Sequence, residues 1–135
     1  MSIVYRIDHQ RRLVVARGLE TVTGPDIFGY QESVWSRGDV SGYNELVDMT
    51  AVKKIEFESS DRARDLASLS ASTDHPVGTA KFAIVAPSDQ AFGLGQMYKA
   101  YRSLDAKSTK RVGVFRTMEE ALAFLGVEGP LEGLD

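Results

Sequence analysis

The chain has 135 residues, of which 43% are hydrophobic and 26% charged, and this is the length and composition of one globular domain. It contains no cysteine, which excludes disulfides, thiolate catalysis and cysteine-ligated metals. The formal net charge of −3 argues against a dedicated nucleic-acid-binding protein, because such proteins usually carry a basic face. The sequence shows no signal-peptide pattern, and it has no apolar stretch as long as the ~20 residues that span a membrane. We therefore expect a cytoplasmic protein.

The first part of the chain predicts a hairpin, a helix and a third strand. Two short apolar runs, residues 3–8 and 13–18, are separated by the polar connector HQRR. The start signal TGPD at residues 23–26 places proline and an acidic residue in the first turn of a helix that ends at SRGD. One side of this helix carries Ile27, Phe28, Gln31, Val34 and Trp35. A third strand is expected near residues 45–49.

Helices and strands then alternate. The stretch SSDRARDLASLSA begins with a serine cap at Ser59 and predicts a helix with an acidic first turn. One side of that helix carries Ala63, Leu66, Ala67 and Leu69. KFAIVA, residues 81–86, is short, apolar and bounded by breakers, and it predicts a buried strand. Residues 87–104 predict a helix whose apolar stripe is Leu94, Met97, Tyr98, Tyr101 and Leu104.

A fifth strand, RVGVFR, and a short last helix complete the predicted fold. Thr117 and Glu120 match a capping box at the start of that helix, and Gly126 is its expected stop. The order β-β-α-β-α-β-α-β-α predicts an α/β fold with four helices and a mixed, mostly parallel five-stranded sheet. We expect residues 1–126 to form a single domain and residues 127–135 to form a frayed tail.

This order and several local motifs resemble the SpoIIAA-like or STAS domain family, which includes anti-sigma factor antagonists. VVARGLE is similar to the family's second strand, which ends at a glycine, and LVDMTAVKKIEFESSDRARDLASL is similar to its strand, connector and switch helix. KFAIVAPSDQAFGLGQMY, together with VGVFRTMEEALAFL, resembles a bacterial subgroup of uncharacterised SpoIIAA-like proteins, related in fold to lipid-carrying Sec14-type domains. The likeness covers roughly residues 3–126. The likeness implies a STAS-like fold more strongly than it implies a function, since the function of that subgroup is not established.

The resemblance draws attention to Ser59. In phosphorylatable members of the family a D-S-S-G or D-S-T-G motif opens the switch helix, and its first hydroxyl residue accepts a phosphate. The matching stretch here is Glu58, Ser59, Ser60 and Asp61, with Glu in place of Asp and Asp61 in place of Gly. A phosphate on Ser59 would gain from the helix N-terminal dipole but would lie beside two like charges. We therefore expect Ser59 and Ser60 to cap the helix, with a regulatory or partner-contacting role as the alternative.

The stretch APSDQAFGLG, residues 86–95, has the order strand, glycines, helix that is typical of a phosphate cradle. A dinucleotide fingerprint needs G-x-G-x-x-G, and Tyr98 occupies the place of the third glycine. Gly93 and Gly95 also lie inside the helical pattern, after the cap at Ser88. We expect these glycines to allow the close approach of a neighbouring segment or to leave room for a ligand, and we expect neither a nucleotide nor another cofactor.

Two functional hypotheses follow, both for a binding protein without catalysis, since no nucleophile with its base and no metal set is evident. In the first, a small apolar or amphipathic, lipid-like ligand binds between the sheet and a mobile helix. Its candidate lining residues are Phe28, Trp35, Phe92, Gly93, Gly95, Met97 and Tyr98. In the second, the surface around Ser59 and Ser60 docks a regulatory protein in the manner of an anti-sigma factor antagonist. The first is preferred for two reasons. The switch motif is degraded, and the glycine and aromatic residues of the third predicted helix are not needed for packing alone.

Further candidates lie at a strand end and in loops. Asp48 and Thr50 follow the third predicted strand, and ligands of open α/β sheets collect at strand carboxyl ends, although turn chemistry also explains this pair. His9 and His75 fall in separate predicted loops and are expected at the surface, with no metal site. The basic cluster KSTKR, residues 107–111, predicts a solvated loop, and membrane contact would be at most peripheral. A homodimer is compatible with both hypotheses.

Overall fold

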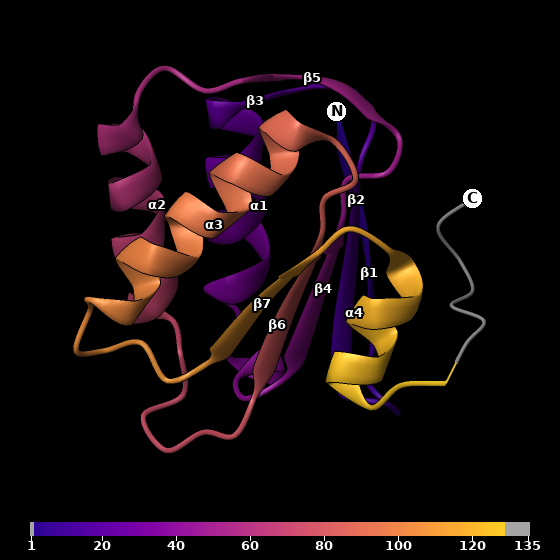
Figure 1. Ribbon diagram of the computed structural model, residues 1–135. Helices are drawn as coiled ribbons and strands as arrows, with labels where there is room; N and C mark the ends of the chain where they lie inside the picture. Colours follow the sequence, from indigo (N-terminus) through magenta and orange to yellow (C-terminus); the bar gives the residue numbers. More distant parts are fainter. Residues whose placement is uncertain (1, 129–135) are drawn as a thin grey trace.

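A five-stranded sheet forms the centre of the fold in the computed structural model, which describes residues 2–128 (Figure 1). In spatial order its strands are β1 (Ile3–Asp8), β2 (Leu13–Gly18), β4 (Asn44–Asp48), β6 (Lys81–Val85) and β7 (Arg111–Phe115). β1 is antiparallel to β2, whereas β2, β4, β6 and β7 are mutually parallel. The mixed, mostly parallel five-stranded sheet predicted from the alternation of elements is confirmed.

Four α-helices cover the two faces of the sheet unequally (Figure 1). Three of them, α1 (Gly24–Trp35), α2 (Ser60–Ser72) and α3 (Asp89–Ser103), lie on one face, and α4 (Met118–Leu125) lies on the other. A short 3-10 helix, Gly38–Val40, follows α1. The four predicted helices are therefore confirmed, and the three-helix face is the thicker layer of the fold.

Alternation along the inner strands divides the core between the two faces. Leu13 and Val15 of β2 join the apolar cluster under α4, whereas Val14 and Ala16 face the three-helix layer. A residue of a strand and its second neighbour lie on the same face, so this division follows directly from the twofold period. The inner strands are buried on both faces because helices cover both.

A second, two-stranded parallel sheet joins β3 (Glu20–Thr23) to β5 (Val52–Glu56). Neither strand is predicted by the sequence pattern, because both are short and β5 carries two exposed lysines beside its single fully buried residue, Ile55. β3 runs directly into α1, and β5 is followed closely by α2. Gly18 at the end of β2 is required here, since a Cβ at this position would lie 2.6 Å from the Val52 side chain.

The predicted helix boundaries are confirmed by their caps. Thr23 and Asp26 form a reciprocal capping box at α1, and the side chains of Ser59, Ser88 and Thr117 each accept the backbone N–H three residues on. Gly126 ends α4 in the left-handed conformation, with φ +72°. The predicted box at α4 is only half formed, because the Glu120 carboxylate accepts from the Thr117 hydroxyl, at 2.9 Å.

The predicted apolar stripe of α3 is confirmed for Leu94, Tyr98 and Tyr101, which join the core cluster, and is wrong at its C-terminal end. The residues of α3 that are buried are Ala91, Gly95, Tyr98 and Arg102, whereas Leu104 is 82% exposed at its C-terminal end. Apart from Tyr98, the fully buried residues are two small residues and one arginine, and a search for large apolar residues does not find them. On α2 the buried residues are Ala63, Leu66, Ala67, Ser70 and Ala71, and the predicted Leu69 is only half-buried.

The end of the chain is described only as far as Glu128. The Val127 side chain packs against the apolar cluster under α4, and its backbone N–H donates to the Leu122 carbonyl at 3.0 Å. The expected frayed tail, residues 127–135, otherwise lies outside the described residues. The division into a domain of residues 1–126 and a tail stays a prediction.

Candidate functional site

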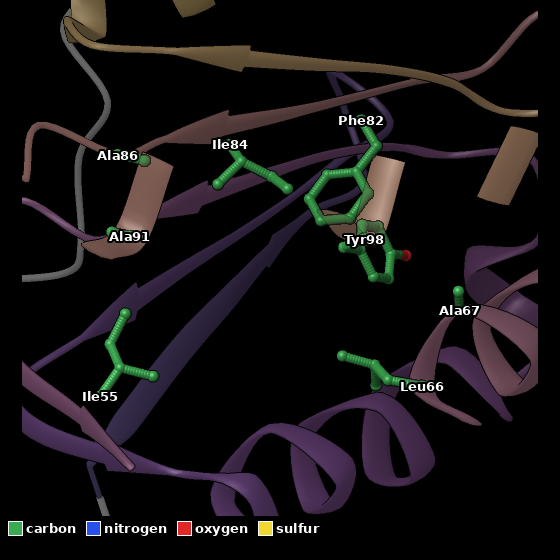
Figure 2. Packing of buried hydrophobic residues seen from close by; sticks show 8 residues of the cluster. All are labelled: Ile55, Leu66, Ala67, Phe82, Ile84, Ala86, Ala91 and Tyr98. Atoms are coloured by element: carbon green, nitrogen blue, oxygen red, sulfur yellow. The ribbon is translucent and has the colours of Figure 1, made fainter. Parts of the chain in front are cut away.

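A cavity of about 120 Å³ lies in the three-helix layer, between the sheet and α2. α1 and α3 form its sides, and β5 closes one end. Figure 2 shows Ile55, Leu66, Ile84 and Tyr98 around this open space. The lining residues are Ile3, Ala16, Gly18, Ile27, Tyr30, Gln31, Glu45, Val47, Met49, Ile55, Phe57, Ala63, Leu66, Ser70, Phe82, Ile84, Ala91, Leu94, Gly95 and Tyr98.

The floor of the cavity is a row of side chains across three parallel strands. Ala16 of β2 pairs with Val47 of β4, and Val47 pairs with Ile84 of β6. Val47 belongs to the central strand of the sheet, yet it is only partly buried. A side chain at this place has neighbours in the sheet on both sides, so its accessible surface faces the cavity.

Small side chains explain why this layer is hollow. α2 turns Ala63 and Ser70 toward the cavity, with Leu66 between them, and α3 contributes Ala91 and Gly95. Protein interiors are normally packed to the density of organic crystals, so small residues gathered from several elements leave a void. The void is therefore a direct consequence of which residues these two helices present inward.

Gly95 sets how closely α3 approaches the sheet. A Cβ on Gly95 would lie 2.9 Å from Val114 Cγ1 on β7, whereas a Cβ on Gly93 would meet nothing within 4 Å. The prediction that the glycines allow a close approach is therefore confirmed for Gly95. Gly93 is exposed on the outer side of the helix and does not line the cavity.

One end of the cavity is polar and is built around a buried carboxylate. Glu45 of β4 is 3% exposed, and its Oε2 accepts the Tyr30 hydroxyl at 2.8 Å and the Trp35 indole N–H at 3.1 Å. Its Oε1 accepts from Lys110 Nζ at 3.2 Å, and this ammonium lies 3.3 Å from the centre of the Trp35 ring. Glu45 thus has three donors, which is how a buried charge is normally compensated.

Burial at this end shifts two pKa values in opposite directions. Burial and, next, the Glu45 charge raise the pKa of Tyr30, so its hydroxyl keeps its proton at neutral pH. Burial lowers the pKa of Lys110, and the attraction of Glu45 opposes that change. The sequence-based expectation that the loop around Lys110 is simply solvated is wrong for this residue, since the Lys110 side chain is 5% exposed.

Hydroxyl and amide groups connect α1 to the end of α2 beside the cavity. Burial raises the pKa of Tyr98, whose side chain lines the cavity. Ser70 Oγ donates to Gln31 Oε1 at 2.9 Å, and Gln31 Nε2 donates to Thr73 Oγ1 at 3.1 Å. These contacts tie α1 to α2 at this end of the cavity.

A second buried ion pair lies behind the polar end. Arg102 is 2% exposed and binds the Asp74 carboxylate with two N–H groups, at 2.8 and 3.1 Å. Asp74 Oδ2 also accepts the backbone N–H groups of Thr109 and Lys110. Arg102 Nε is buried and has no hydrogen-bond partner. Asp74 therefore fixes the loop that delivers Lys110 to Glu45.

The structure brings two of the seven predicted lining residues to the cavity, Gly95 and Tyr98. The residues that do not line it are Phe28, Trp35, Phe92, Gly93 and Met97. Trp35 instead belongs to the separate cluster around Val14 and Tyr43. Phe28 and Phe92 lie partly exposed under the guanidinium groups of Arg62 and Arg116, each at 4.1 Å. Both rings pack against the apolar cluster around the cavity but do not line the cavity itself.

The candidates for a partner surface lie elsewhere. Ser59 and Ser60 are exposed at the start of α2, where the Ser59 hydroxyl accepts the Arg62 N–H. Asp48 Oδ1 accepts both the backbone N–H and the hydroxyl of Thr50, at 2.9 and 2.5 Å, which is turn chemistry. Asp48 and Thr50 therefore sit at the carboxyl end of β4, while the polar end of the cavity lies at its amino end, beside Glu45.

Sequence reasoning missed most of the polar end. Glu45 lies inside a predicted strand, but a single acidic residue in an apolar run gives no indication of its partners. Tyr30, Ser70 and Lys110 come from three other segments of the chain, and Lys110 follows Glu45 by 65 residues. The alternation of β4 does place Glu45 and Val47 on one face, and this was the available signal.

Two other kinds of site find no support in residues 2–128. That part of the chain holds no group of three or more histidine, aspartate or glutamate side chains placed to bind a metal ion. None of its helices combines the length and the apolar character that crossing a membrane demands.

No protein-family model matches the sequence, and no curated protein matches it either. Solved structures do match the fold. One is the crystal structure of an uncharacterised DUF3478-family protein with a SpoIIAA-like fold from Shewanella loihica PV-4. It is 13% identical, the match covers 92% of this chain and 94% of that chain, and the TM-score is 0.58. The resemblance stated from the sequence motifs is thus confirmed at the level of the fold. Over almost its whole length, this chain has a SpoIIAA-like α/β fold.

Proposed function

We propose that this chain is a non-catalytic binding domain that holds the apolar part of a small amphipathic, lipid-like ligand in the cavity beneath α2. The cavity itself carries the proposal, with its volume of about 120 Å³ and its largely apolar walls. An engineered apolar cavity of about 150 Å³ in another protein binds benzene. By that comparison, this space admits a single ring or a short alkyl segment.

The distribution of polarity in the cavity supports an amphipathic ligand over a purely apolar one. Toward β5 the walls are apolar, with Met49, Ile55 and Phe57. At the other end lie the polar side chains of Glu45 and Ser70. Ligand sites are typically apolar surfaces with a few placed polar groups that fix the orientation.

A longer ligand has two ways to extend beyond the cavity. Ile27, Phe57 and Leu94 line it but are only partly buried. A second hollow of about 80 Å³ lies beside it, and the two share Ile3 and Tyr30. A molecule larger than the cavity therefore has apolar surface on which its remainder can lie.

α2 is the wall best suited to move. It packs mainly against α3 and α1, and its buried side chains are small apart from Leu66. The chain on either side of it is exposed, at residues 58–59 and 75–79. Segments with few buried apolar contacts open at low free-energy cost. This supports entry of the ligand under α2.

A protein-docking role at Ser59 has less support. Within residues 2–128 the large hydrophobic side chains that are exposed are Tyr5, Val77 and Leu104, and none belongs to α2. A stable docking surface normally has an apolar centre. The outward face of α2 is polar instead, with Asp61, Arg64, Asp65 and Ser68.

The test is native mass spectrometry of protein purified without detergent, compared with the same sample after denaturation. We expect an additional mass of a few hundred daltons that is lost on denaturation. The variant Ala63→Leu places a larger side chain in the cavity and should abolish this mass. Ala100→Leu makes the same change on the exposed side of α3 and should retain it. A clean apoprotein mass in the wild type would count against a tightly held ligand and in favour of a partner protein at Ser59.

A further inference from the structure

The seam between β5 and the first turns of α3 closes the apolar end of the cavity. From β5 and the residue after it come Ile55 and Phe57, and from α3 come Ala91 and Leu94, and all four line the cavity. Ile55 and Ala91 are buried in the same apolar cluster, whereas Phe57 and Leu94 are only partly buried. This seam is therefore one of the places where the cavity comes near the surface.

The side chain of Gln90, in the first turn of α3, joins the two sides of this seam. Its Nε2 donates to the Ile55 carbonyl at 2.9 Å, and its Oε1 accepts the Ile55 backbone N–H at 3.4 Å. The amide thus pairs with β5 much as the backbone of a neighbouring strand would. Gln90 is not needed as a cap, because Ser88 caps α3 through the Ala91 N–H. Since Gln90 is an exposed residue, water can replace its two bonds at low cost.

β5 is anchored firmly at its start and weakly at its end. At the start, the Ala51 carbonyl accepts the Glu20 N–H at 3.1 Å, and the Val52 side chain lies close against Gly18. Toward the end, Ile55 is the single fully buried residue of the strand, and the partner strand β3 has only four residues. Segments with few buried apolar contacts open at low free-energy cost. The bonds from α3 to Ile55 are therefore well placed to decide how often this end of β5 opens.

We propose that Gln90 is the latch of the cavity: its bonds to Ile55 hold the end of β5 against α3, and their release lets a ligand pass along this seam. This inference rests on the proposed function. It also specifies the entry under α2, because residues 57–59 join β5 directly to α2, so a displaced β5 moves the start of that helix with it. Gln90 does not line the cavity. It therefore acts on the rates at which a ligand enters and leaves, and not on how tightly the ligand is held.

The experiment measures the binding rates of 4-fluorotoluene, a single ring with one methyl group, by fluorine NMR exchange spectroscopy. Gln90→Met keeps an unbranched side chain of similar length and removes the amide. We expect it to raise the association and dissociation rate constants together, by roughly threefold to tenfold, as the loss of about one net hydrogen bond predicts. The dissociation constant should stay within about twofold. Gln96→Met makes the same change at an exposed position of the same helix and should leave both rate constants unchanged.

A third variant tests whether the ligand enters at the other end of α2 instead. Thr73 Oγ1 accepts from Gln31 Nε2 at 3.1 Å and so joins the end of α2 to α1. Thr73→Val keeps the shape of the side chain and removes this bond, and Thr73 does not line the cavity. If the latch lies at Gln90, the rate constants of Thr73→Val stay close to those of the wild type.

The outcomes separate the two proposals. Unchanged rate constants in Gln90→Met, or equal acceleration in Gln96→Met, would overturn the latch and leave the binding function standing. Acceleration in Thr73→Val alone would also overturn it, since the entry would then lie at the far end of α2. A dissociation rate constant that rises while the association rate constant does not would show that Gln90 stabilises the bound state, which contradicts a latch. Absence of 4-fluorotoluene binding to the wild type would overturn both proposals.

Discussion

Asp74 is the buried residue on which the polar end most depends. Its carboxylate is fully buried and compensates Arg102 while it holds the backbone of Thr109 and Lys110. Asp74→Asn removes the charge and leaves the Arg102 guanidinium buried without a counter-ion. Breaking a buried pair in this way costs about 3–5 kcal/mol.

Urea denaturation of Asp74→Asn should show that loss in the free energy of unfolding. Lys53→Gln serves as the control, because the ion pair between Lys53 and Glu20 is exposed and such pairs contribute at most about 1 kcal/mol. If both variants lose equally little, the buried pair does not stabilise the fold as described.

Asp26 gives the fold a defined sensitivity to acid. Hydrogen bonds from the Ser2 hydroxyl and then from Thr23 hold the pKa of Asp26 below its usual value. A carboxylate with a lowered folded-state pKa stabilises the fold fully above its unfolded value, near pH ~4. That contribution is lost as the pH falls through the lower, folded-state pKa.

We therefore expect the wild type to lose more stability than Asp26→Asn when the pH drops from 5 to about 2. Urea titrations at several pH values measure this difference. The contributions of the other carboxylates to the pH dependence cancel, because both proteins contain them. Parallel loss in the two proteins would show that Asp26 is not the group responsible.

Local chemistry at single residues was predictable, whereas buried partners were not. Ser59, Ser88 and Thr117 were predicted as caps because a cap and the N–H that it accepts lie within one turn. The partners of Glu45 and Asp74 come from distant segments, with Arg102 lying 28 residues after Asp74. Such pairs are set by the packing of helices, which no local pattern specifies.

At the level of elements, the two glycines of α3 offer a matched pair of substitutions. Gly93→Ala should raise the free energy of unfolding by about 0.5–1 kcal/mol, because the position is exposed and helical and the added Cβ meets nothing. Gly95→Ala should lower it by about 1–3 kcal/mol, because Val114 is β-branched and cannot easily turn away. Thermal and urea denaturation of both variants measure the signs. A stabilising Gly95→Ala would mean that α3 can move away from the sheet without cost.

The number of helices and of main-sheet strands was predictable, but the inner face of α3 was predictable only in part, through Leu94, Tyr98 and Tyr101. Large apolar residues predicted a stripe that includes Met97 and Leu104, whereas α3 approaches the sheet through Ala91 and Gly95. A helix that packs closely turns its smallest side chains inward. The pairing of β3 with β5 was missed for a related reason, because a pair of very short strands depends on where the large sheet places its ends.

For the whole molecule, the cavity predicts a response to pressure. Unfolding under pressure is favoured in proportion to the internal void that it eliminates. Ala63→Leu fills part of the space beneath α2, so the volume change on unfolding should be smaller in magnitude than in the wild type. Ala100→Leu should leave it unchanged. Fluorescence of Trp35, the single tryptophan, under increasing pressure measures all three proteins. Equal volume changes would show that the space is already collapsed or filled with water in solution.

The topology of the molecule followed from the alternation of elements, but the cavity did not. Five strands and four helices in this order favour one open sheet with crossovers of a single hand. The cavity is an absence of atoms at the junction of α1, α2, α3 and the sheet, and each lining residue taken alone is ordinary. Only the assembled three-helix layer shows that its small residues lie next to one another.

The unequal covering of the sheet also bears on how such a domain diverges in evolution. The apolar cluster under α4, around Leu13, Leu46 and Leu125, contains none of the residues that line the cavity. Substitutions at well-separated sites act almost additively, and apolar exchanges are tolerated where volume can adjust. Mutations at Ala63 or Ala91 therefore alter what the cavity accepts while the opposite face keeps the chain folded. On the proposed function, a lineage with this fold could therefore exchange one ligand for another through a handful of substitutions in α2 and α3.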